Sequence, residues 1–195
     1  MPSPTLYLVR HGQTDWNAHG RFQGQRDIPI NVTGRGQARH NGETLRRLLC
    51  DPEDYDYIAS PLARARETME IVRQTLGLPP RGYETDSRLK EVSYGAWEGY
   101  TTQEVKDLIP KDRRRRREDK FRFTPPQGES YAMLLDRVLA WLPYIECDTI
   151  VVAHGGVIRV LMHHLGGMDV EEAVNFIVPQ DRIFRWDGDK MDWLG

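Results

Sequence analysis

Short apolar runs alternate with longer amphipathic stretches along most of this chain. Three runs are short and apolar enough to be buried strands of a parallel sheet: Thr5–Arg10, Tyr57–Ser60 and Thr149–Ala153. The stretches between them carry apolar residues at helical spacing. This alternation predicts an α/β fold, with a three-layer α/β/α sandwich around a mostly parallel central sheet.

The amphipathic stretches have recognisable start and stop signals. A first helix is expected behind Thr33 as its N-cap. A second runs from about Pro61 to Leu76, with Ser60 as N-cap and a glycine and a proline behind it. A third covers about Ser130 to Leu142. The residues expected on the buried face of the first helix are Ala38, Leu45, Leu48 and Leu49.

Near the end of the chain, the apolar positions recur with a different period. Residues Ile183–Leu194 alternate on either side of Asp187 and Gly188, which is a hairpin signal. Strands joined by a tight hairpin are antiparallel, so we expect an antiparallel edge of the sheet near the C-terminus. No internal repeat or low-complexity linker divides the sequence, and we expect a single domain over residues 1–195.

The first predicted strand ends directly in Arg10 and His11, followed by a glycine. Ligands of open α/β sheets bind just beyond the carboxyl ends of the strands. An arginine beside a histidine at that place indicates a phosphate clamp with a nucleophile next to it. A charged turn after a strand is the simpler interpretation, and this motif alone leaves the two about evenly balanced.

The strand Thr149–Ala153 repeats this arrangement, because it ends in His154 and is followed by two glycines that open a helical pattern. Free N–H groups and the dipole at a helix start favour an anion. Two strand ends that each present a histidine before a glycine can face each other across one pocket. The repetition therefore favours a functional site over two unrelated structural histidines.

Two further stretches carry candidate functional side chains. Arg64 lies one turn into the helix that begins near Pro61, where a cation opposes the helix dipole and an anionic partner would offset it. Glu91 lies among apolar neighbours in a stretch rich in glycine and aromatic residues, an environment that suits a general acid. Taken alone, Glu91 is more simply an exposed loop carboxylate.

These motifs together resemble the histidine phosphatase superfamily, the phosphoglycerate mutase-like proteins. The resemblance covers nearly the whole chain, and its segments occur in the family's order. They are LVRHGQT (Leu8–Thr14), RFQG (Arg21–Gly24), SPLARARET (Ser60–Thr68), LKEVSYGAWEG (Leu89–Gly99) and VVAHGGVIR (Val151–Arg159).

The resemblance implies a role for each matching residue. His11 would be the nucleophile that takes the phosphoryl group. Glu91 would donate a proton to the leaving oxygen and then act as base for water. The groups that would hold the phosphate oxygens are Arg10, Asn17, Arg64, His154 and the backbone N–H of Gly155. Because these cations and N–H donors already meet the charge of a transferring phosphoryl group, we expect neither a metal nor a cofactor.

The resemblance also bears on the reaction. Mutases of the family carry a longer insertion with paired arginines between the glutamate and the second histidine, and a C-terminal tail that closes the site. Here the interval from Glu91 to His154 is short and the chain ends soon after the hairpin. We therefore expect a histidine acid-type phosphatase that hydrolyses a small phosphorylated metabolite. A cofactor-dependent phosphoglycerate mutase and a phosphoprotein or phosphohistidine phosphatase are the alternatives.

One stretch, KDRRRRREDK (Lys111–Lys120), is unlike the rest. If it is helical, Arg114 pairs with Glu118 and Arg115 with Asp119 at i, i+4 spacing. A solvated helix face is the simpler interpretation, and a basic lid that steers anionic substrates is the functional one. The cations left on one stripe are Arg113, Arg116, Arg117 and Lys120.

Composition sets the remaining bounds. The chain has 195 residues, 39% of them hydrophobic and 29% charged, as in ordinary soluble proteins. Its net charge of −2 argues against nucleic acid as the main partner. Cys50 and Cys147 follow no motif and indicate free thiols in a reducing compartment. Without a membrane span or signal peptide, we expect a cytoplasmic protein with no membrane partner, and a homodimer is left open.

Overall fold

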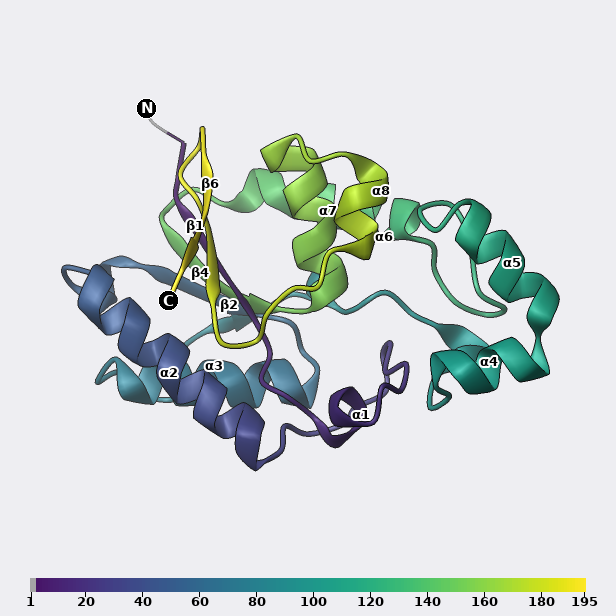
Figure 1. Ribbon diagram of the computed structural model, residues 1–195. Coiled ribbons are helices and arrows are strands. Elements are labelled where there is room, and N and C mark those ends of the chain that lie inside the picture. Colours follow the sequence, from purple (N-terminus) through teal and green to yellow (C-terminus); the bar gives the residue numbers. More distant parts are fainter. Residues whose placement is uncertain (1–2) are drawn as a thin grey trace.

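A six-stranded sheet runs through the computed structural model, which describes residues 3–195 (Figure 1). The strand order is β3-β2-β4-β1-β5-β6. Strands β1, β2, β3 and β4 pair in parallel, and β5 and β6 are antiparallel to their neighbours. The strands are β1 (Leu6–Arg10), β2 (Asp56–Ala59), β3 (Glu84–Thr85), β4 (Thr149–Ala153), β5 (Ile183–Trp186) and β6 (Met191–Leu194). The predicted mostly parallel sheet with an antiparallel C-terminal edge is confirmed.

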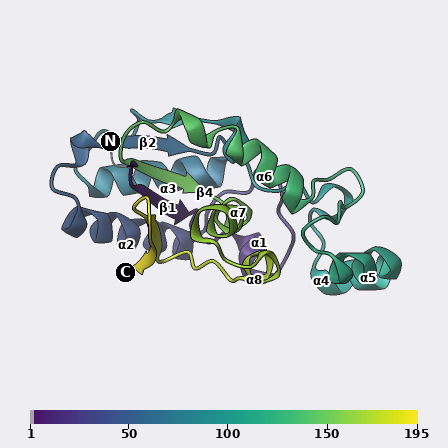
Figure 2. The ribbon, with the colours of Figure 1, turned by 90° about the horizontal axis from the view of Figure 1, so that it is seen from above.

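Helices cover both faces of the sheet (Figures 1 and 2). On one face, α2 (Val32–Leu48) and α3 (Ala63–Thr75) pack on Tyr7 and Val9 of β1. On the other, α6 (Tyr131–Leu139) and α7 (Gly155–Gly166) pack on Leu6 and Leu8. Successive side chains of a strand point to opposite faces, so one five-residue strand anchors both hydrophobic clusters. The predicted three layers follow from this alternation.

The register between β1 and β4 determines where the two histidine motifs lie. Arg10 is the partner of Ala153 across the parallel pair. The next residue on each strand, His11 and His154, therefore leaves the same edge of the sheet side by side. The amide of His11 still donates to the carbonyl of Ala153 at 3.0 Å, which extends the pairing by one residue.

The first two helices begin at other residues than predicted. Helix α2 has Asn31, not Thr33, as its N-cap, because the Asn31 side chain accepts a hydrogen bond from the amide of Gly34 at 3.0 Å. Leu48 of this helix is exposed rather than part of the buried face. Helix α3 begins at Ala63 behind Leu62, so Ser60 does not cap it. The Ser60 hydroxyl is instead hydrogen-bonded to His154.

Helix α6 confirms its predicted N-cap but ends earlier. The Ser130 hydroxyl accepts from the amide of Met133 at 3.2 Å. The helix ends at Leu139 rather than near Leu142, and a separate 3-10 turn covers Leu142–Tyr144. The proline inside that turn lacks an N–H and disfavours helical backbone at the residue before it, so the α-helix stops ahead of it.

A pair of short helices, α4 (Thr102–Leu108) and α5 (Pro110–Glu118), projects beyond the end of the sheet (Figures 1 and 2). The predicted pair of Arg114 with Glu118 forms at 3.0 Å. The predicted pair of Arg115 with Asp119 does not, because the helix ends at Glu118. Arg115 faces Asp112 at 3.8 Å instead, and Asp119 pairs with Arg122.

The remaining helices are α1 (Asp15–Ala18), before α2, and α8 (Val170–Asn175), which packs on α7. Within residues 3–195, both cysteines, Cys50 and Cys147, are exposed and free. Across the same residues, none of the helices combines the length and the apolar character needed to cross a bilayer.

Candidate active site

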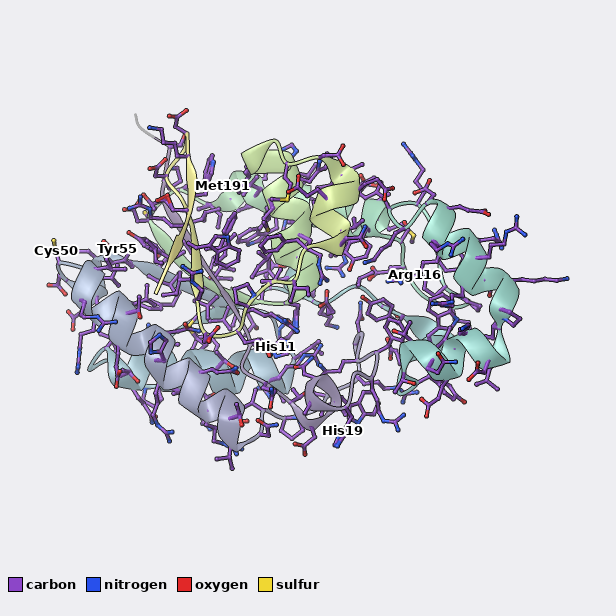
Figure 3. All side chains as sticks on the ribbon, in the orientation of Figure 1. His11, His19, Cys50, Tyr55, Arg116 and Met191 are labelled. Carbon is purple, nitrogen blue, oxygen red and sulfur yellow. The ribbon has the colours of Figure 1, made fainter. Side chains whose placement is uncertain are left out.

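A cavity of about 180 Å³ opens beyond the carboxyl ends of β1 and β4. Six of the seven predicted site residues line it: Arg10, His11, Asn17, Arg64, Glu91 and Gly155. They come from a strand end, three helices and a loop. Figure 3 shows His11 where β1 ends. The seventh residue, His154, is fully buried, and its ring lies 5.1 Å from that of His11, centroid to centroid.

The hydrogen bond of His11 fixes which ring nitrogen is available. Its Nδ1 lies 2.8 Å from the carbonyl oxygen of Gly12. A carbonyl only accepts, so Nδ1 carries the proton and donates it, and Nε2 of the neutral ring keeps its lone pair. Gly12 is held in turn: its amide donates to the Thr68 hydroxyl at 3.0 Å. A side chain on Gly12 would collide with the backbone of Gly34.

His154 is held by the residue that was predicted to cap α3. Its Nε2 lies 2.7 Å from the Ser60 hydroxyl, and both residues are fully buried. Nδ1 of His154 is buried and has no hydrogen-bond partner among the described residues. His154 also serves as the N-cap of α7 without a side-chain capping bond. His154 therefore keeps one ring nitrogen that can still form a hydrogen bond.

The surroundings of both histidines favour the neutral ring. Burial lowers the pKa of His11 well below its usual value, and the guanidinium groups of Arg64 and Arg10 lower it further. Burial likewise lowers the pKa of His154, followed by the charges of Arg64, His11 and Arg10. A neutral imidazole with a free nitrogen is a competent nucleophile at neutral pH.

Two buried guanidinium groups leave a donor without a partner. Arg10 donates from Nη1 to the carbonyl of Val178 at 2.6 Å, and Arg64 donates to the carbonyls of Arg26 and Gly24. The Nε of each arginine is buried and unpaired within residues 3–195. Burial, and then the charge of Arg159, lowers the pKa of Arg10 to about 10. These unsatisfied donors favour an anion in the cavity.

Glu91 is fixed against the first turn of α7. Its Oε1 accepts from the backbone amides of Val92 at 2.9 Å and Gly156 at 3.0 Å. Oε2 has only a longer contact, 3.2 Å, with the same Gly156 amide. Glu91 is half-buried and faces the cavity, so Oε2 is the oxygen that can exchange a proton with a ligand.

Two residues that the sequence did not single out also shape the site. Gln180 donates from Nε2 to the carbonyl of His11 at 2.9 Å and to Oδ1 of Asn17 at 3.2 Å. With that oxygen occupied, the amide nitrogen of Asn17 is left as a donor to the cavity. Gln180 lies in the loop before β5 and belongs to no recognisable motif. Arg159, which also lines the cavity, could have been identified from the sequence, because it follows Gly155 by one helical turn and therefore lies on the same face of the helix.

Comparisons with known proteins show which family the chain resembles. The histidine phosphatase superfamily (branch 1) matches the chain over residues 6–193. The uncharacterized phosphatase PhoE of Bacillus subtilis is 37% identical over 169 residues, which are 84% of this chain and 78% of that protein. The 2,3-bisphosphoglycerate-dependent phosphoglycerate mutase 2 of Gloeobacter violaceus is 30% identical, over 89% of this chain and 83% of that protein.

Among solved structures, a mycobacterial glucosyl-3-phosphoglycerate phosphatase, determined with VO3, superimposes with a TM-score of 0.79. The two chains are 28% identical, and the match covers 98% of this chain and 97% of the other. The similarity therefore extends over nearly the whole fold.

Proposed function

The chain belongs to the histidine phosphatase superfamily, and we propose that it is a phosphomonoesterase that works through a phosphohistidine on His11. The observation that carries the proposal is the hydrogen bond from Nδ1 of His11 to the carbonyl of Gly12, which leaves Nε2 free at the cavity. The proposed substrate is a small phosphorylated metabolite.

Phosphoryl transfer spreads negative charge over three oxygens, which need fixed positive groups around them. The unpaired Nε groups of Arg10 and Arg64, with the amide nitrogen of Asn17, supply such groups in the cavity. The ring of His154 and the backbone N–H of Gly155 complete the proposed set. Because these groups meet the charge of the phosphoryl group, the proposed reaction needs no metal ion.

The two chemical steps use the same pair of residues. First, Nε2 of His11 attacks phosphorus while the bond to the ester oxygen breaks, and Glu91 gives its proton to that oxygen. Water then attacks the phosphohistidine while Glu91 takes a proton from it, and the bond between phosphorus and Nε2 breaks. Inorganic phosphate leaves, and His11 and Glu91 return to their starting states.

A phosphoglycerate mutase is the second candidate function, and the similarity to the mutase of Gloeobacter violaceus favours it. Both reactions pass through phosphorylated His11. A mutase must exclude water while its bound intermediate changes orientation in the site, whereas a phosphatase must admit water to the phosphohistidine. The greater identity to a phosphatase and the short interval from Glu91 to His154 support hydrolysis.

One assay separates these functions. Purified protein is first given a chromogenic phosphate ester and then a panel of phosphorylated metabolites. With phosphoglycerate primed by bisphosphoglycerate, phosphate release and isomer ratio are measured on the same sample. We expect phosphate release with little isomerisation. Fast isomerisation with negligible phosphate release would replace the phosphatase proposal with the mutase, and no reaction on any ester would refute both.

A further inference from the structure

The loop between α8 and β5 contains an extended stretch, the 176–180 segment (Figure 1). Phe176 lies in the extended region, with φ −62° and ψ 134°. Pro179 fixes its own φ and disfavours helical backbone at Val178, the residue before it. Successive residues of extended backbone point to opposite sides. The 176–180 segment can therefore turn every second residue to the active site and the residues between them to solvent.

Two carbonyls of this segment bind arginines of the active-site cavity. The carbonyl of Phe176 accepts a hydrogen bond from Nε of Arg159 at 2.8 Å. The carbonyl of Val178 accepts from Nη1 of Arg10 at 2.6 Å. Ile177, which lies between them, is 84% exposed, whereas Val178 is buried. The segment therefore has one face on the site and the other in solvent.

Gln180 continues this alternation, and its side chain holds two residues of the site. Its Nε2 donates to the carbonyl of His11 at 2.9 Å and to Oδ1 of Asn17 at 3.2 Å. A carbonyl only accepts, so the Gln180 atom that faces His11 must be the amide nitrogen. That nitrogen, together with the backbone amide of Thr14 at 3.2 Å, requires an oxygen from Asn17. The orientation of the Asn17 amide is therefore determined from outside the cavity.

The backbone of Gln180 is anchored to α2 by Asn41. Nδ2 of Asn41 donates to the Gln180 carbonyl at 3.0 Å. Asn41 is 1% exposed, and its Oδ1 has no hydrogen-bond partner among residues 3–195. Asparagine is a poorer helix former than alanine, and a buried unpaired oxygen costs free energy. The hydrogen bond to Gln180 is the interaction that offsets these costs of Asn41.

We infer that Gln180 is a positioning residue, anchored by Asn41, that turns the amide nitrogen of Asn17 toward the bound phosphoryl group. Among the described residues, Gln180 is not one of those that line the cavity, so it acts through Asn17. Without its donor, the Asn17 amide can rotate and present its oxygen to the phosphoryl oxygens, which repel it. This inference rests on the proposed function, because it places a phosphoryl group in the cavity beside His11.

A double-mutant cycle on phosphate binding tests the inference without turnover. Calorimetry compares the affinity for inorganic phosphate of the wild type, Gln180→Met, Asn17→Ala and the double variant. Methionine keeps the length of glutamine and removes both donated hydrogen bonds. Gln180→Met should weaken phosphate binding about three- to tenfold, as expected for lost hydrogen bonds. In the Asn17→Ala background, the same change should have no further effect.

The cycle separates positioning from a general structural role. Equal losses with and without the Asn17 side chain would overturn the inference, because they would show that Gln180 does not act through Asn17. Gln180→Ala, which requires no new packing, repeats the cycle if methionine disturbs the fold. Ile177→Ala is the matched control on the opposite, exposed face of the segment and should keep the wild-type affinity. A loss of similar size in Ile177→Ala would also contradict the inference.

Asn41→Ala tests the anchor in α2. Phosphate affinity should fall about two- to fivefold, because the Gln180 backbone loses one hydrogen bond. In the Gln180→Met background, Asn41→Ala should cause no further loss. Gly36→Ala, a change in the same helix where a side chain meets no atom within 4 Å, should bind phosphate like the wild type. Wild-type affinity in Asn41→Ala would overturn the inference as stated.

Turnover distinguishes a failure of this inference from a failure of the proposed function. If the wild type binds phosphate but hydrolyses no ester, the proposed function fails, and the binding cycle still decides the role of Gln180. Asn17 can contact the phosphoryl oxygens in both the substrate and the transition state. On a chromogenic ester, Gln180→Met should therefore raise KM by about the factor lost in phosphate affinity and change kcat less. A fall in kcat with unchanged KM would overturn the inference, because it would place the effect on His11 rather than on Asn17.

Discussion

The carboxylate of Glu91 lies directly on the backbone amide of Gly156, with Oε1 3.0 Å from the amide nitrogen. A side chain at position 156 would collide with that same oxygen. Glycine at 156 therefore allows the candidate proton donor to approach the first turn of α7. The contact joins two motifs that are far apart in the sequence, the one around Glu91 and the one around His154.

Gly156→Ala should therefore displace Glu91 without removing it. We expect kcat on alkyl phosphates to fall by about a hundredfold, as for other small misplacements of a catalytic group. Gly36→Ala is the matched control, because a side chain there meets no atom within 4 Å. It should leave kcat unchanged and stabilise α2 by about 1 kcal/mol. Wild-type activity of Gly156→Ala would show that the contact does not position Glu91.

Glu91→Gln tests the proton donor itself. Loss of general acid catalysis should lower kcat by roughly 10²–10⁴ on alkyl phosphates, whose leaving oxygen needs a proton. Aryl phosphates need little protonation and should lose much less. Steady-state kinetics on both ester types provide the measurement. Equal losses on the two types would count against a proton-donor role for Glu91.

The sequence could predict that most of the candidate site residues line one cavity, because several of them lie at the ends of regular elements. Strand β4 occurs over the predicted residues, and β1 begins one residue late, at Leu6. Parallel neighbouring strands end at one edge, so the motifs after β1 and β4 had to meet there. The orientation of the His11 ring was not predictable in the same way. It depends on the direction of the Gly12 carbonyl, which is set by contacts with Thr68 and Gly34 from two other helices.

The misplaced helix caps and the overlooked Gln180 share one physical cause. Several polar residues have more than one possible partner, and local rules consider only the nearest. Ser60 was expected to cap α3, but it binds His154, 94 residues away in the chain. Thr33 was expected to cap α2, but Asn31 does so. Gln180 could not be identified because both of its partners, His11 and Asn17, lie more than 160 residues away.

The reaction should be independent of metal ions. The unpaired donors of Arg10 and Arg64 already provide positive groups for the phosphoryl oxygens. Activity on a phosphate monoester should therefore survive exhaustive treatment with EDTA. Vanadate, which can adopt the five-coordinate geometry of the transition state, should inhibit competitively. Loss of activity on chelation that is restored by a divalent ion would contradict this prediction.

The two neutral histidines should make the fold sensitive to acid. Their pKa values in the folded protein lie well below 6.5, the value expected in the unfolded chain. Below about pH 6.5 the unfolded state binds more protons, so the free energy of unfolding falls as the pH drops; above it, this contribution is fully present. Each histidine adds a slope of up to about 1.4 kcal/mol per pH unit.

His154→Gln removes one of these contributions. Urea unfolding between about pH 5 and pH 8 should show a shallower dependence in this variant than in the wild type. His164→Gln replaces an exposed histidine of the same helix and is the matched control, with the wild-type dependence expected. If His154→Gln keeps the full wild-type slope, the buried ring is not neutral in the folded protein.

Trapping the phosphoryl group tests the central claim most directly. Protein is mixed with a labelled phosphate monoester, quenched within milliseconds, and analysed for the position of the label. We predict an adduct on His11 that is labile in acid and stable in base, as expected for a phosphorus–nitrogen bond, and no adduct or turnover in His11→Ala. His164→Ala should label like the wild type. Absence of label on His11 during turnover, or near wild-type turnover by His11→Ala, would contradict the account.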